Sequence, residues 1–188
     1  DGEMITVSCA EGETGKIYDG KLQWEEKDID FSSIKMPKTK PMLILGDPDR
    51  AFELAAYPNE GVGLVRLEFI ITNAIQVHPM ALVKFNELKD AKAKDTIAKL
   101  TKSYADKEGY FIDRLAEGVA TIAAAFYPKD VIVRMSDFKT NEYANLIGGK
   151  EFEPVEANPM IGFRGASRYY DEKYVGGFFP ELEAKKKV

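Results

Sequence analysis

Gly61-Val-Gly-Leu-Val-Arg66 is a short apolar run that ends on an arginine. Such a run is typical of a strand that is covered on both faces in a parallel sheet. A comparable run at Met42–Leu45 comes before it, and another at Val131–Val133 comes later. After the first run, Gly46-Asp47-Pro48 offers a turn, a helix N-cap and a first-turn proline, so a helix is expected to about Tyr57. The pattern predicts strand, helix and strand in succession.

Helical patterns fill most of the chain between the second and third apolar runs. The helix predicted between the first and second runs has an apolar stripe that consists of Ala51, Phe52, Ala55 and Ala56. Beyond Arg66 we expect a helical insertion, with one helix opening near Pro79, one through Ile97–Tyr104 and one from about Asp106 to Phe126. In the last helix the apolar positions step by three and four: Ile112, Leu115, Val119, Ile122 and Phe126.

Strands that alternate with helices indicate parallel βα units, which form either an open doubly wound sheet or an eight-stranded barrel. Spacing alone does not choose between the two. Three strands cannot close a barrel, so barrel material of this length would have two unpaired edges. The chain starts at Asp1 without an initiator Met and stops in an apparently helical stretch, Pro180–Val188. We therefore expect it to be part of a longer polypeptide.

The first forty residues have a different character. Ile5, Val7 and Cys9 alternate with polar residues ahead of a glycine-rich turn, which predicts a small β-hairpin. A polar stretch with Pro37 and no sustained period follows and is interpreted as a linker. The predicted division is a hairpin segment at 1–20, a linker at 21–40 and a main domain at 41–188.

Composition narrows the functional class. Of 188 residues, 45% are hydrophobic and 30% are charged, as in a soluble globular domain. The formal charge of -5 argues against a nucleic-acid partner, and no apolar run is long enough to span a membrane. The single cysteine, Cys9, excludes an internal disulfide and a multi-thiolate zinc site, which favours a cytoplasmic location and a buried thiol.

Two arginines directly follow predicted strands. Arg66 ends the second apolar run and Arg134 ends the third. Ligands of parallel βα folds bind at the carboxyl ends of the strands, and the planar guanidinium binds phosphate or carboxylate through two hydrogen bonds. The two side chains could therefore converge on one anion. The alternative is structural ion pairing, of Arg66 with Glu68 and of Arg134 with Asp137.

Further polar candidates lie beyond the third strand. Asp137 and Lys139 could orient a substrate or hold the arginines, or they could cap a helix. Arg164 and Arg168 lie near a predicted helix start, where an anion is favoured, although they could also be solvated. The only histidine, His78, precedes Pro79 and is expected to cap a helix rather than to carry a phosphoryl group.

Several strings resemble a known family, the phosphoenolpyruvate (PEP)-utilising enzymes. Glu60-Gly-Val-Gly-Leu-Val-Arg-Leu-Glu-Phe-Ile-Ile71 resembles the family's second-strand signature, with Leu67 in place of the usual Thr. Val133-Arg-Met-Ser-Asp-Phe-Lys-Thr-Asn-Glu-Tyr143 and Asn158-Pro-Met-Ile-Gly-Phe-Arg-Gly-Ala-Ser-Arg168 are similar to the synthase branch of the family in particular. Val7-Ser-Cys-Ala-Glu-Gly-Glu-Thr-Gly15 resembles the tail of a swivelling phosphohistidine domain.

This resemblance implies an α/β fold with a partial (β/α)8 TIM-type barrel, preceded by a short β-hairpin. It also implies an enzyme that converts pyruvate, ATP and water into PEP, AMP and phosphate through a phosphohistidine, with magnesium. By motif match, Arg66, Arg134 and Arg164 would bind the phosphoryl group during its transfer and the substrate oxygens. The full set of candidates is Arg66 and Arg134 as catalytic residues, with substrate binding by Arg66, Arg134, Arg164, Asp137, Lys139 and Arg168.

The resemblance places other parts of the machinery outside this chain. The phosphorylated histidine would lie before Asp1, the magnesium carboxylates and a cysteine acid after Val188, and ATP would bind a separate domain. The expected partners are pyruvate and PEP, in a full-length homodimer, and the piece alone would be inactive. Two alternatives are a non-catalytic, self-associating fragment and the same segment of a pyruvate phosphate dikinase. The continuation Ser136-Asp-Phe-Lys139 argues against the dikinase.

Overall fold

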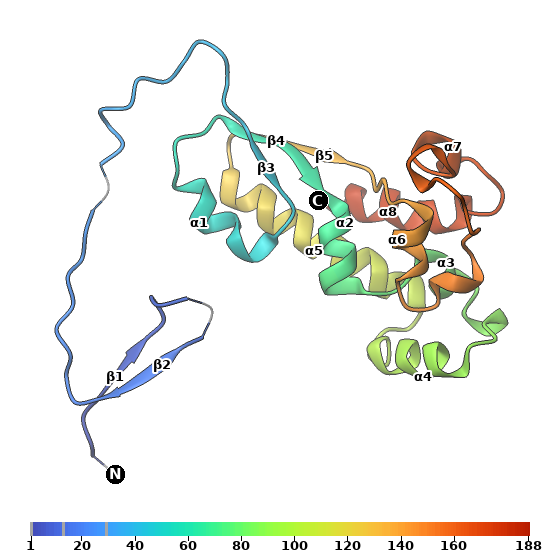
Figure 1. The fold of residues 1–188 in the computed structure, drawn as a ribbon, viewed down its shortest axis with the longest axis horizontal. Helices are drawn as coiled ribbons and strands as arrows, with labels where there is room; N and C mark the ends of the chain where they lie inside the picture. The colour runs from blue at the N-terminus through green and yellow to red at the C-terminus, as the bar shows by residue number, and fades with distance from the viewer. Residues whose placement is uncertain (1, 13, 29) are drawn as a thin grey trace. The chain divides into compact units, whose positions relative to one another are not determined.

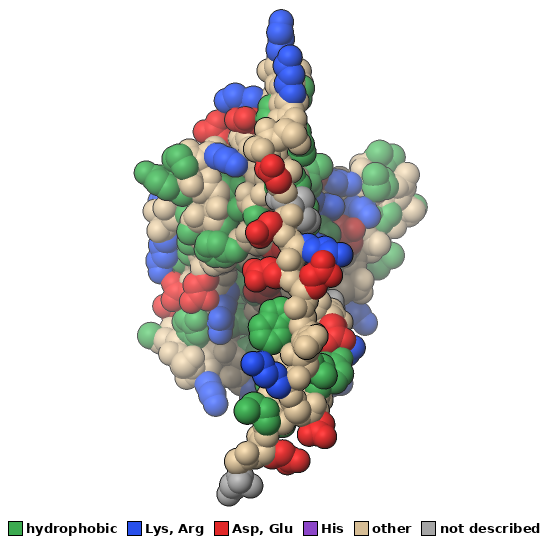
Figure 2. Space-filling view, turned by 90° about the vertical axis from the view of Figure 1, so that its left-hand side faces the viewer, with side chains coloured by type: hydrophobic (Ala, Val, Ile, Leu, Met, Phe, Trp, Pro, Cys, Tyr) green, Lys and Arg blue, Asp and Glu red, His purple; other side chains and the backbone are tan. Residues whose placement is uncertain are grey.

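The computed structural model describes residues 2–12, 14–28 and 30–188, and the chain forms two compact units, Asp1–Lys35 and Met36–Val188 (Figure 1). Within the described residues, no helix combines the length and the apolar character that crossing a bilayer requires. Acidic and basic side chains are interspersed on the face shown in Figure 2, as the modest net charge leads us to expect.

The first unit contains the predicted hairpin. Strands β1 (Ile5–Ser8) and β2 (Lys16–Asp19) pair in antiparallel fashion, with Ile5 opposite Asp19. The side chains of Ile5, Val7 and Ile17 are exposed. Cys9 is also exposed, so the prediction of a buried thiol was wrong. The physical reason is that a two-stranded hairpin of this size buries little unless another layer packs on it.

The second unit is built on a parallel sheet. Strands β3 (Leu43–Leu45), β4 (Gly61–Arg66) and β5 (Asp130–Arg134) lie side by side in the order β3-β4-β5. This confirms the predicted α/β class and the three strands. Neighbouring strands are consecutive in the sequence, as in the wall of a (β/α)8 barrel, which is the arrangement expected from the sequence.

Only one face of this sheet is fully covered. Leu45, Val62 and Val65 are buried on the helical side, whereas Ile44 is 71% exposed and Ile132 is 55% exposed. The prediction that the strands are covered on both faces was therefore wrong for this chain. In a closed barrel, the uncovered face would point into the interior, where side chains from the other strands fill the space.

The first crossover follows the predicted cap. The side chain of Asp47 accepts a hydrogen bond from the backbone of Asp49 (3.0 Å) and leads into η1 (Pro48–Arg50) and α1 (Ala51–Ala55). The predicted apolar stripe was wrong at Phe52, which is 65% exposed, and at Ala56, which is also exposed, while Ala51 is fully buried. Adjacent helical residues differ by about 100°, so the side packed on α5 includes Ala51 and leaves Phe52 outside it.

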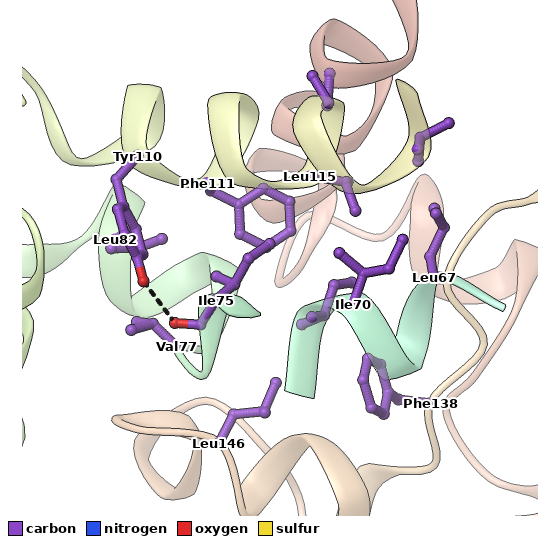
Figure 3. Packing of buried hydrophobic residues seen from close by; sticks show 14 of the residues in the cluster. Leu67, Ile70, Ile75, Val77, Leu82, Tyr110, Phe111, Leu115, Phe138 and Leu146 are labelled. Carbon is purple, nitrogen blue, oxygen red and sulfur yellow. Dashed lines mark hydrogen bonds between the residues drawn. The ribbon is translucent and has the colours of Figure 1, made fainter. Parts of the chain in front are cut away.

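Helix α5 (Lys107–Phe126) is the central element of the core; it begins where predicted, and the side chain of Asp106 caps it. Phe111 and Leu115 pack toward Ile70 and Ile75 on the segment after β4 (Figure 3). The hydroxyl of Tyr110 donates a hydrogen bond to the carbonyl of Ile75 (3.1 Å). Most of the predicted stripe is buried, with Ile112 partly so.

The sequence pattern missed the helical segment that directly follows β4. Helix α2 (Leu67–Ile70) follows β4 without a break and continues into a π-helix, η2 (Ile71–Ile75). Gln76 then adopts a left-handed conformation (φ 67°), which ends the helix. The remaining elements are α3 (Pro79–Val83), η3 (Phe85–Glu87), α4 (Ala91–Leu100), α6 (Thr140–Ala144), η4 (Gly149–Glu151), η5 (Pro159–Ile161), α7 (Ala166–Tyr169) and α8 (Val175–Lys187).

Candidate functional site

The carboxyl edge of the sheet carries the candidate site. Arg66 and Arg134 are register partners at the ends of β4 and β5, so their backbones lie side by side. The side chains of both arginines line a surface cleft with a volume of about 510 Å³. Five of the six candidates line this cleft: Arg66, Arg134, Asp137, Lys139 and Arg164.

Arg134 is held by a buried carboxylate. Its Nη2 donates to Oε1 of Glu68 at 2.6 Å, and the same oxygen accepts the backbone N–H of Asp137 at 2.7 Å. The predicted pairing of Arg134 with Asp137 is a longer contact, 4.0 Å. The ion-pair alternative is thus present, with Glu68 rather than Asp137 as the main partner.

Arg66 differs from Arg134 in this respect. Its guanidinium is exposed and makes no ion pair with any described carboxylate. It lies over the ring of Phe69, 4.9 Å from the ring centre. A cation that stacks on an aromatic ring and has no carboxylate partner keeps its hydrogen-bond donors available for an anionic ligand.

Arg164 joins the cleft through Asp137. Its Nε and Nη2 donate to the two carboxylate oxygens at 3.0 and 2.8 Å, which is a bidentate pair. The hydrogen bonds from Arg164 lower the pKa of Asp137, although burial opposes them. Arg164 is therefore fixed in direction rather than solvated.

Lys139 combines both of the roles considered for it. It lines the cleft, and its Nζ lies 2.9 Å from Oε1 of Glu142. It is also the N-cap residue of α6, and the carboxylate of Glu142 accepts its backbone N–H at 2.8 Å. Burial acts to raise the pKa of Glu142, but the hydrogen bonds from Lys139 outweigh it and lower that pKa.

Arg168, the sixth candidate, lies outside the cleft. Its side chain is 1% exposed and makes a bidentate pair with Glu153, at 2.5 and 2.7 Å. It also donates to the carbonyl of Phe163, and its guanidinium lies over the ring of Tyr143. The guanidinium of Arg168 is therefore bonded to other residues of the protein and is not directed at the cleft.

His78 caps α3, as predicted. Its Nδ1 accepts the backbone N–H of Met80 at 3.1 Å, so its Nε2 carries the hydrogen and faces Oε1 of Glu153 at 2.9 Å. Burial lowers the pKa of the imidazole despite the hydrogen bond to Glu153. Both ring nitrogens are used, and the side chain is fully buried.

Some lining residues were not among the candidates. Glu68 follows Arg66 by two positions and had been considered only as a partner of Arg66. Thr72 and Asn73, on η2, and Asn145 add neutral polar groups. Of the described side chains lining the cleft, four are cationic and three are carboxylates, so the cleft has a small excess of positive charge.

The described residues of this chain do not form a magnesium site. Among the described residues, no three His, Cys, Asp or Glu side chains gather as metal ligands would. In the cleft, Glu68 is engaged by Arg134, Asp137 by Arg164 and Glu142 by Lys139. A cation would have to compete with arginines and a lysine already in contact with these carboxylates.

Comparison with known proteins identifies the family. Residues 24–184 match the family model described as PEP-utilising enzyme, PEP-binding domain. The chain belongs to the PEP-utilising enzyme family. The sequence resemblance is thereby confirmed, and the cleft lies within the matched residues.

Relatives in the PEP-utilising family align along the whole chain. It is 55% identical to phosphoenolpyruvate synthase of Synechocystis sp., over 100% of this chain and 23% of that protein. It is 53% identical to the phosphoenolpyruvate synthase of Pseudomonas aeruginosa and 50% identical to that of Escherichia coli, in each case over 100% of this chain and 24% of the relative. The chain thus spans about a quarter of the length of these curated relatives.

Proposed function

We propose that this chain is part of a phosphoenolpyruvate synthase, an enzyme that makes PEP, AMP and phosphate from pyruvate, ATP and water through a phosphohistidine. The observation that carries the proposal is the placement of Arg66 and Arg134 as register partners that open into one cleft. The names of the relatives support the synthase rather than a dikinase.

The arginines have distinct roles in this proposal. Arg66, which has no ion-pair partner among the described residues, would bind the phosphoryl group or the substrate carboxylate directly. Arg134 and Arg164 are held in direction by Glu68 and Asp137 and would neutralise charge on the moving phosphoryl group. Phosphoryl transfer depends mainly on positioning and on such electrostatic stabilisation.

Lys139 would add a further positive charge to the same ligand, and Asp137 would act by holding Arg164. Arg168 would not touch the ligand, because its guanidinium is bonded to Glu153 and does not line the cleft. Neither role weighed for Arg168, substrate binding or a solvated surface position, includes the buried ion pair with Glu153, and its burial favours this ion pair.

The remaining components would come from other parts of the enzyme. His78 is buried with both ring nitrogens bonded, so the phosphohistidine would be a different residue. Magnesium and ATP would likewise be bound by residues outside this chain. We include a cytoplasmic homodimer in the proposal.

The test is pyruvate-dependent AMP formation by a full-length protein that contains this segment. Arg134→Ala should abolish PEP production, because it removes a cation at the end of β5. Arg114→Ala is the matched control, since Arg114 is an exposed arginine on α5 that pairs with Glu117. Wild-type PEP synthesis by Arg134→Ala would place Arg134 outside the chemistry.

A second candidate is a self-associating, non-catalytic piece, which the exposed Ile44 and Ile132 favour. Unpaired strand edges and an open apolar face are common routes to association. The 188-residue chain alone is expected to form no AMP. AMP formation by that chain would show that the missing components are not needed.

A further inference from the structure

A buried polar cluster lies behind the loop that joins β5 to α6. The cluster consists of Ser136, Tyr143, Tyr174 and Glu181, each exposed by 1% or less. None of these four residues lines the cleft. Buried polar groups are costly unless they are hydrogen-bonded, so the partners of each group show what the cluster holds in place.

Glu181 is the acidic member of this cluster. It comes from α8, and its Oε2 accepts the backbone N–H of Ser136 at 3.1 Å. Its Oε1 accepts the hydroxyl of Ser136 at 2.5 Å. Ser136 Oγ also contacts the hydroxyl of Tyr143 at 2.7 Å, and that hydroxyl contacts Tyr174 at 2.6 Å. Both oxygens of a buried carboxylate thus bind one residue of the loop.

The next residue of the loop is held in the same way from the other side. The backbone N–H of Asp137 donates to Glu68, on α2, at 2.7 Å. The hydroxyl of Tyr169 donates to the carbonyl of Ser136 at 2.7 Å. Two successive backbone amides are therefore bound by two buried carboxylates, and the carbonyl between them is bound by a tyrosine. Such a loop has little freedom to change direction.

One cation of the cleft and the carboxylate that holds another lie on either side of Ser136 in the sequence. Arg134 lies two residues before it, and Asp137, which binds Arg164 through both oxygens, directly follows it. A small displacement of Ser136 would therefore change the direction of Arg134 and, through Asp137, of Arg164. In a site that works by positioning, a displacement of about 1 Å can lower the reaction rate strongly.

We infer that Glu181 is a positioning residue for the cleft: it fixes Ser136 and thereby the directions of Arg134 and Arg164, without touching the ligand. Its kinetic test rests on the proposed synthase function. The inference itself concerns the order of the loop, which can be measured separately.

The decisive variant is Glu181→Asp in the full-length protein. It keeps a carboxyl group but withdraws that group by one methylene from Ser136. We expect kcat/KM for pyruvate to fall about tenfold, the equivalent of one lost hydrogen bond to a charged group. Glu181→Gln keeps an oxygen that can accept the Ser136 amide, so it should restore kcat/KM toward the wild-type value.

Glu153→Gln is the matched control. Glu153 is also a carboxylate with a buried side chain, but it binds Arg168 and His78 and makes no bond to residues 135–139. It should lower thermal stability while leaving kcat/KM close to wild type. An equal kinetic loss in Glu153→Gln, or wild-type kcat/KM in a folded Glu181→Asp, would overturn the inference.

Amide hydrogen exchange gives a readout that does not depend on the reaction. The amides of Ser136 and Asp137 should exchange faster in Glu181→Asp than in the wild type. In Glu153→Gln their exchange rates should equal those of the wild type. Unchanged exchange at these amides in Glu181→Asp also overturns the inference. If the wild-type protein forms no pyruvate-dependent AMP, the proposed function fails, and the exchange result still decides the role of Glu181.

Discussion

Arg66 and Arg134 occupy equivalent positions at the ends of neighbouring strands, but their surroundings differ. The guanidinium of Arg134 is bonded to the buried Glu68, while that of Arg66 stacks on Phe69 and has no carboxylate partner among the described residues. Two residues of one type at one sheet edge therefore divide between a pre-oriented cation and a more adaptable one. The difference should be visible in stability as well as in binding.

We expect Arg66→Ala to change the free energy of unfolding by no more than about 0.5 kcal/mol, as for an exposed residue that supports no other group. Arg134→Ala should cost about 1–3 kcal/mol, because it leaves a buried oxygen of Glu68 with one hydrogen bond fewer. Urea unfolding of the two variants measures both values. Equal stability losses would mean that the contact between Arg134 and Glu68 adds little to folding.

The acidity of Glu181 makes a second prediction at the residue scale. Burial raises its pKa from 4.5 to about 7, although its hydrogen bonds to Ser136 oppose the shift. Between these two pH values the folded protein keeps a proton that the unfolded chain has released. Stability from this group is complete below about pH 4.5, falls as the pH rises, and levels off above about pH 7.

The full loss amounts to about 3 to 4 kcal/mol, taking about 1.4 kcal/mol for each unit of pKa. Glu181→Gln cannot release a proton and should not show this loss. The difference in unfolding free energy between wild type and Glu181→Gln, measured from pH 4.5 to 8, should therefore move in favour of the variant as the pH rises. A difference that is constant across this range would refute the shift.

The positions of the candidate residues could be predicted best where they directly follow a strand. Arg66 and Arg134 could be placed because each directly follows a strand, and parallel strands end at one edge. Arg164 and Arg168 could not be separated by spacing. Gly165 lies between them with φ of 60°, which turns the chain so that one side chain faces the cleft and the other is buried. Glu181 gave no signal, because glutamate in a helix is usually solvated.

At the scale of the elements, helices with clear caps and periodicity were predictable. The three-and-four spacing predicted α5, with its start near Asp106, and Gly46-Asp47-Pro48 predicted η1 and α1. The segment α2–η2 was missed, because Arg66 enters it with extended backbone and no side-chain cap. No glycine or proline separates β4 from this helix, so the change from strand to helix has no local marker.

Helix α5 offers a test in which packing and helix propensity oppose each other. Gly118 lies in its buried face, and a Cβ there would meet Cγ2 of Ile70 at 2.8 Å. Gly118→Ala should gain about 1 kcal/mol from helix propensity but lose about 1–3 kcal/mol to overpacking, so we expect a net loss of stability.

Ala120→Gly is the matched control, because Ala120 is exposed on the same helix. It should lose about 1 kcal/mol through propensity alone. Thermal or urea unfolding of the two variants separates the effects. A more stable Gly118→Ala would show that Ile70 can move aside without cost, and the tight contact between α5 and α2 would then matter less than the geometry suggests.

At the scale of the second unit, the sheet has one covered and one open face. The sequence predicted apolar strands, but it could not show which face has a covering layer within this chain. Ile44 on β3 and Ile132 on β5 are exposed, while Leu45 and Val65 are buried against the helices. Exposed apolar groups on a sheet with unpaired edges favour association.

The 188-residue chain on its own is therefore expected to self-associate, with a native mass that rises with concentration. The double variant Ile44→Lys and Ile132→Lys places two charges on the open face and should shift the chain toward the 21.0 kDa monomer. Val155→Lys is the control, because Val155 is a fully exposed apolar residue outside the sheet. Native mass spectrometry or sedimentation distinguishes the outcomes. Association that survives the double variant would have to use another surface, and a monomeric wild-type chain would show that the open face alone is too small to bring copies together.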